Sequence, residues 1–84
     1  MQKDLYLAKM RQARIDALKG KYVIICDSPK NKNIRLYMQD QTLSQKGYWT
    51  AYMANAKGFS NLEDAQRVCS HLKYNHPRIA MIES

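Results

Sequence analysis

Long apolar stretches are missing from this sequence. No run of apolar residues approaches the roughly 20 that a membrane-spanning helix requires, which argues against an integral membrane protein. The first twenty residues, MQKDLYLAKMRQARIDALKG, are charged throughout and so do not form a secretory signal. Asp4, Asp16 and the lack of serine also count against an organelle transit peptide. We therefore expect a protein of the cytoplasm that makes no membrane contact.

Cysteine is scarce too, since the 84 residues contain only Cys26 and Cys69. Both lie among apolar neighbours, the first in a predicted strand and the second in a predicted helix. Buried thiols in a chain without a secretory signal are typical of a reducing compartment. A disulfide between the two is an alternative that nothing in the sequence indicates.

Motifs for catalysis and for metal binding are absent from the sequence. There is no glycine-rich phosphate loop, and no serine or cysteine lies in a recognisable nucleophile motif. His71, His76 and Tyr74 could in principle form a nuclease-like site, but the sequence favours His71 as a solvated helix residue and His76 as a turn residue. No C-x-x-C or H-x-x-x-H pair is present. We expect no catalytic residue, no metal site and no cofactor.

The pattern of apolar residues predicts an α+β fold in a single domain, 1–84, in which a basic helix (1–20) precedes a βββαβ core (21–84). Ala, Leu, Lys, Arg and Gln favour a helix over 3–19, and Gly20 follows its end. Apolar or alternating runs predict strands, and a capped amphipathic pattern predicts a second helix. The predicted strands are KYVIICD (21–27), IRLYMQ (34–39), YWTAYMA (48–54) and the short RIAMIE (78–83).

The order of these elements predicts the topology. The first three strands can pair as an antiparallel meander, and the second helix can cross one face and deliver the final strand to the sheet. SNLE, Ser60 to Glu63, has the form of a capping box at the start of that helix. The residues that we expect in the core around it are Trp49, Met53, Phe59, Leu62, Ala65, Cys69 and Leu72.

The first helix carries two apolar stripes at helical spacing. One comprises Leu7, Ala8, Ile15 and Leu18, and the other Tyr6, Met10, Ala13 and Ala17. Two stripes on one short helix suggest contacts on two sides, one with its own sheet and one with a second copy of the chain. A homodimer through this helix is therefore an expectation.

The core resembles a group of small proteins encoded by phages and prophages, among them the toxin-inhibitory factors of T-even phages. The matching residues lie between 21 and 83: Tyr22-Val23-Ile24, Trp49-Thr50, Ala56-Lys57, Phe59, Asp64-Ala65 and the Ile79 to Ile82 strand. The resemblance excludes the first helix. It implies the strand–strand–helix–strand fold and a phage origin, and it implies a host toxin or defence protein as a partner.

Basic residues are plentiful: 14 Lys and Arg stand against 7 Asp and Glu, a net charge of +7. Such a surplus favours an anionic partner, nucleic acid before others. The first quarter of the chain holds much of it, in Lys3, Lys9, Arg11, Arg14, Lys19 and Lys21. A helix is a convenient carrier of cations for phosphate contacts. A solvated helix that serves packing is the alternative.

The predicted sheet offers a second candidate surface. Arg35 and Tyr37 share one face of the second strand, and Tyr48 and Tyr52 can join them from the third. Aromatic rings beside cations suit the stacking of single-stranded nucleic acid. Lysines at the neighbouring connections complete the candidate set: Lys30, Lys32, Lys46 and Lys57. Half-burial of the tyrosines under a helix is the alternative.

Together these patterns favour a small, non-enzymatic protein that binds nucleic acid, RNA more than DNA, mainly through phosphate contacts. In the phage context that the resemblance implies, this binding would block a host defence or toxin–antitoxin system. The alternative is an inhibitor that masks an acidic protein partner without nucleic acid.

Overall fold

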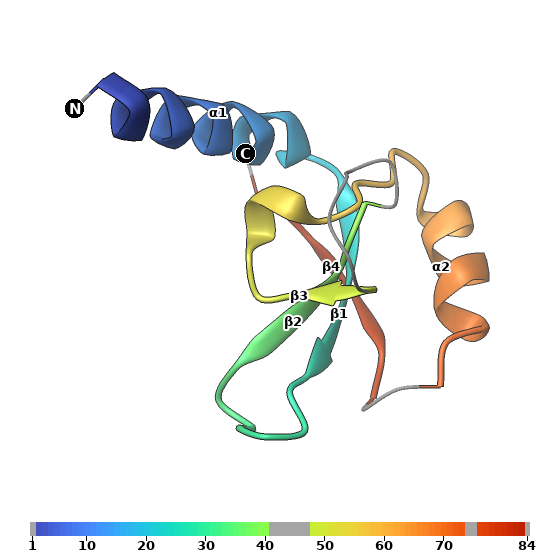
Figure 1. Ribbon diagram of the computed structural model, residues 1–84. Coiled ribbons are helices and arrows are strands. Elements are labelled where there is room, and N and C mark those ends of the chain that lie inside the picture. Colours follow the sequence, from blue (N-terminus) through green and yellow to red (C-terminus); the bar gives the residue numbers. More distant parts are fainter. Residues whose placement is uncertain (1, 41–47, 74–75, 84) are drawn as a thin grey trace.

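In the computed structural model, the chain forms an antiparallel sheet with helices on both sides (Figure 1). The structure describes residues 2–40, 48–73 and 76–83, with side chains from Ala8 onward. The elements are α1 (Gln2–Leu18), β1 (Tyr22–Asp27), β2 (Arg35–Met38), β3 (Trp49–Thr50), the 3-10 helix η1 (Met53–Asn55), α2 (Leu62–Ser70) and β4 (Arg78–Met81). The predicted α+β class is therefore confirmed.

The four strands lie in the order β3-β2-β1-β4, and every neighbouring pair is antiparallel. The first three strands thus pair as the predicted meander, and β4 joins the free edge of β1. Strand β1 is central because it is apolar on both faces. Val23, Ile24 and Cys26 are fully buried, and Ile25 is nearly so.

The two faces of the sheet are covered by different segments. Helix α2 contacts β1 and β4 on one face, while α1 and η1 lie on the other side of the sheet (Figure 1). Val23 lies opposite Ala80, and Ile25 lies opposite Tyr37, so these residues share the second face. There Leu18 and Ala56 close a buried cluster with Val23 and Ile25.

Helix α1 is held to the rest of the fold mainly by its C-terminal part. It contacts η1, with Leu18 buried and Ile15 half-buried, and its N-terminal half extends past the sheet (Figure 1). Met10, Ala13 and Ala17 of the second apolar stripe are exposed. Of the first stripe, Ile15 and Leu18 pack within the chain while Ala8 is exposed. The homodimer through this helix stays a prediction.

The third strand is much shorter than predicted. The alternation over 48–54 suggested one continuous strand, but β3 ends at Thr50. The Tyr52 amide donates to Thr50 Oγ1 (3.1 Å), and the Asn55 amide donates to the Tyr52 carbonyl (3.0 Å). These local hydrogen bonds compete with the ladder and turn the chain into η1. Met53 consequently packs on the core from a 3-10 turn.

The segment Ala56 to Phe59 bridges β1 to the end of β2. The Lys57 amide donates to the Met38 carbonyl (2.9 Å), and Phe59 exchanges two backbone hydrogen bonds with Tyr22 (2.7 and 2.8 Å). Ala56 also forms an isolated bridge with Gln39. Lys57 and Gly58 are thus fixed against the beginning of β1, where α1 ends.

The start of α2 differs from the predicted capping box. Asn61 is the N-cap, and its Oδ1 accepts from the Glu63 amide (2.8 Å). Because the pairing of Phe59 with Tyr22 keeps the chain extended, Ser60 still precedes the helix. Ala65 is buried as predicted, but Leu62 in the first turn is 40% exposed. The prediction that Leu62 belongs to the core was wrong.

Replacement of Gly58 by alanine should destabilise the domain by about 1–3 kcal/mol, the usual cost of overpacking. The added Cβ would lie 2.7 Å from Leu18 Cδ2 and 3.1 Å from Lys21 Cδ. Leu18 is buried and cannot simply move aside. Urea denaturation measures the loss, and the Leu18→Val change in the same background should recover part of it. A variant as stable as the wild type would contradict this packing.

Candidate functional site

Three predicted phosphate-binding residues converge on one pocket. Arg14 of α1, Lys21 before β1 and Lys57 after η1 line an open pocket of about 300 Å³. The sequence separates them by up to 43 positions, and the bridging segment Ala56 to Phe59 brings them together. The remaining lining residues are Ala17, Leu18, Asp40, Ala54, Ala56 and Gly58.

Arg14 is the best anchored of the three cations. Its Nη1 donates to Asn55 Oδ1 (3.2 Å), and Asn55 itself is buried. The Asn55 carbonyl accepts from the Asp40 amide (2.9 Å), which ties the same turn to the end of β2. The guanidinium is therefore held at the pocket by a residue of η1 while further N–H groups stay able to donate.

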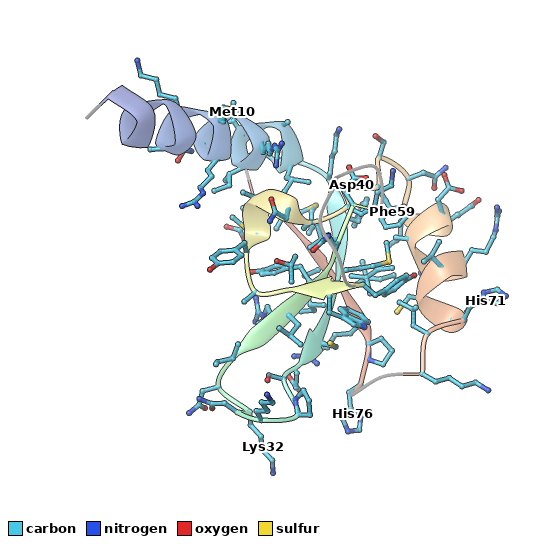
Figure 2. All side chains as sticks on the ribbon, viewed as in Figure 1. Met10, Lys32, Asp40, Phe59, His71 and His76 are labelled. Carbon is cyan, nitrogen blue, oxygen red and sulfur yellow. The ribbon has the colours of Figure 1, made fainter. Side chains whose placement is uncertain are left out.

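Four of the residues that line the pocket are small. Ala17, Ala54 and Ala56 carry only methyl groups, and Gly58 has no side chain. These small residues leave space between the lysines and Arg14, and Leu18 is the one large apolar side chain among the described lining residues. Asp40 is the one carboxylate among the described lining residues, and Figure 2 shows it near the C-terminal end of α1. Three cations against one carboxylate leave a net charge of +2 around the pocket.

A second group of charges lies at the other end of β1. Arg78 Nη2 donates to Asp27 Oδ1 (2.9 Å), and Arg35 lies opposite Asp27 in the strand register. The hydrogen bond from Arg78 lowers the pKa of Asp27, and the charges of Arg78, His76 and Arg35 act in the same direction. The sequence prediction included Arg35 but missed Arg78.

The Asp27 pairing predicts acid sensitivity. The pKa of Asp27 is below its ordinary value in the folded state. Its ionised form therefore stabilises the fold above the ordinary carboxyl pKa of about 3.9, and this contribution disappears as the pH falls through the lower folded value. In Asp27→Asn, the free energy of unfolding should depend less on pH below about 4.5. Urea denaturation at several pH values compares the wild type with Asp27→Asn. Identical pH profiles of the unfolding free energy would contradict the pairing.

The lysine-bearing turn lies beside this second group. Lys30 and Lys32 are exposed between β1 and β2. A second pocket, of about 490 Å³, is lined by Asp27, Ser28, Pro29, Lys32 and His76. Figure 2 shows Lys32 and His76 at the end of the sheet that lies far from α1. The basic residues of the sheet thus form a group separate from the pocket at Arg14.

The three predicted stacking tyrosines have different environments. Tyr37 is half-buried and packs against the core cluster. The Tyr48 ring, 41% exposed, lies edge-on to Trp49 at 5.8 Å. Tyr52 is 66% exposed but follows the end of β3, so strand alternation does not place it with Tyr37. Among them, Tyr52 offers the most accessible ring.

The remaining candidate residues lie mostly on α1. The side chains of Lys9, Arg11 and Lys19 are exposed, and Lys19 pairs with Asp16 at 3.2 Å. Hydrogen bonds from Gln12 and then Lys19 lower the pKa of Asp16. Lys3 lies in α1, but its side chain is outside the described part. Lys46 also lies outside the described residues.

Both cysteines are free thiols, Cys26 buried and Cys69 half-buried. Burial raises the pKa of each, which disfavours the reactive thiolate. Among the described residues, no three His, Cys, Asp or Glu side chains come close enough together to hold a metal ion. Within those same residues, neither helix is long and apolar enough to cross a membrane.

No family model, curated protein or solved structure matches this chain. The resemblance to phage proteins and the role against a host toxin or defence protein therefore stay predictions.

Proposed function

We propose that this protein binds single-stranded nucleic acid, RNA in preference to DNA, without catalysing a reaction. The observation that carries the proposal is the convergence of Arg14, Lys21 and Lys57 on one open pocket. Cations on long side chains, around a cavity lined partly by small residues, suit the oxygens of a phosphate group. The net charge of +7 on the whole chain would attract a polyanion toward this site.

The arrangement of the cations favours a single strand over a duplex. The exposed basic residues Lys9, Arg11 and Lys19 lie on different sides of α1 and give no single basic helix face for a groove. The pocket holds its cations in a hollow, and Tyr52 presents an exposed ring for a base. Single-strand binding combines such phosphate contacts with aromatic stacking.

Salt dependence tests the proposal. We expect the logarithm of the association constant for a labelled single-stranded RNA to fall with the logarithm of salt concentration. The slope should be about −2 or steeper, since each phosphate contact to a single strand contributes about −0.7 and three cations line the pocket. Fluorescence anisotropy measures this, with DNA of the same sequence for comparison.

Two results would contradict the proposal. One is the absence of RNA binding at low salt. The other is displacement of the RNA by polyglutamate at equal charge concentration, because a site that recognises charge alone would then serve an acidic protein partner.

A further inference from the structure

We propose that the pocket at Arg14, Lys21 and Lys57 binds a phosphomonoester, the terminal phosphate group of a strand or of a free nucleotide. An internal phosphodiester is the competing ligand. The inference rests on the proposed function and specifies the part of the nucleic acid that enters the pocket.

Charge is the first argument. The three cations and Asp40 leave two positive charges around the cavity. A phosphomonoester carries about −1.5 to −2 charges at neutral pH, whereas an internal diester carries about −1. The monoester therefore balances the pocket more closely. It also has three terminal oxygens, which allows Arg14, Lys21 and Lys57 to contact it at the same time.

The shape of the pocket is the second argument. Leu18 and Ala56 are both buried, so the inner wall of the pocket is closed by the core. Gly58 continues that wall, and even a methyl group on it would collide with Leu18. A strand can therefore leave only through the open side of the pocket, which a terminal phosphate uses once and an internal phosphate must use twice.

The volume of the pocket also agrees with a terminal phosphate as its ligand. A volume of about 300 Å³ lies at the lower end of small-ligand pockets, which range from about 300 to 1,000 Å³. Such a cavity accommodates a phosphate and its sugar and leaves the following nucleotides outside. Asn55 keeps the Arg14 guanidinium in place before any ligand enters, so little ordering is required on binding.

The experiment compares single-stranded RNAs of one sequence that carry a 5′-phosphate, a 3′-phosphate or hydroxyl groups at both ends. We expect at least one phosphorylated RNA to bind about tenfold more tightly than the hydroxyl form, the change that corresponds to one strong charge-assisted contact. The preference should vanish in the Lys21→Gln/Lys57→Gln double variant. It should persist in Arg67→Gln/Lys73→Gln, which removes the same charge from α2 and the residues after it.

A nucleoside monophosphate and inorganic phosphate, added as competitors, distinguish the sources of the phosphate. A monophosphate that competes as strongly as the phosphorylated RNA supports the pocket and identifies a free nucleotide as its ligand. Weak competition by the monophosphate also supports the pocket, and it identifies the end of a strand as the ligand. Equal affinity for all three RNAs, with a steep salt slope, would overturn the proposal that the pocket binds a phosphomonoester. The proposed binding of nucleic acid would still stand. The absence of any RNA binding would overturn both.

Discussion

Ile24→Ala should cost this domain about 2–5 kcal/mol of unfolding free energy, the range measured for truncating a large buried aliphatic side chain. Ile24 is fully buried in β1 and lies opposite Ile79 of β4. Because β1 is bonded to both β2 and β4, the cavity would lie at the centre of the sheet. A domain of this length is stable by about 4–13 kcal/mol, so the variant loses a large part of its stability.

Urea denaturation of wild type and variant measures this loss. Ile24→Val removes a single methylene and should cost only about 0.5–1.5 kcal/mol. Ile34→Ala is the exposed control, since Ile34 lies outside β2 and is 44% exposed, and it should change stability far less than Ile24→Ala. Equal midpoints for Ile24→Ala and the wild type would contradict the central position of β1.

The Lys21→Gln/Lys57→Gln variant should lose at least about tenfold of its affinity for single-stranded RNA at low salt. Both lysines line the pocket from different segments, and both are half-buried there. Two lost phosphate contacts should also make the salt slope shallower by about 1.4. Glutamine removes the charge and keeps Cβ and Cγ, the first two of the four methylenes in the lysine stem. Anisotropy titrations at several salt concentrations give both quantities.

Arg67→Gln/Lys73→Gln is the matched control because it removes the same charge from exposed positions in and after α2. The ion pair that it breaks, between Arg67 and Asp64 at 3.9 Å, is exposed and contributes little. Its RNA affinity should fall far less than that of the lysine variant. Equal losses in the two variants would show that only net charge matters and would contradict a local site.

Much of the fold could be predicted from the sequence, because the strongest patterns decide it. Val23 to Cys26 form an unbroken apolar run rich in β-branched residues, which is typical of a strand buried on both faces. The amphipathic pattern of α2 predicts a helix on one face of the sheet. Together with the last strand, it limits the number of possible topologies. The end of the third strand could not be predicted, since the strand is shorter than its sequence pattern. Its alternation continued past Thr50, but side-chain and turn hydrogen bonds at Thr50 and Tyr52 ended it.

The residues of the candidate site were predicted one by one, but their grouping was not. Arg14, Lys21 and Lys57 meet because Lys57 and Phe59 pair with strands far away in sequence, and such pairing leaves no local pattern. Arg78 was missed for a related reason. It joins Asp27 only through the antiparallel register of β1 and β4, although the opposite charges at those two strand ends were visible.

The most direct test of the central claim, that the pocket at Arg14, Lys21 and Lys57 holds nucleic-acid phosphate, is a titration of the ¹⁵N-labelled protein with single-stranded RNA. Backbone amide shifts report where the ligand lies. We expect the largest changes at Leu18 to Lys21 and at Ala54 to Gly58, with little change along α2. Changes confined to α2, or to the turn with Lys30 and Lys32, would contradict the claim.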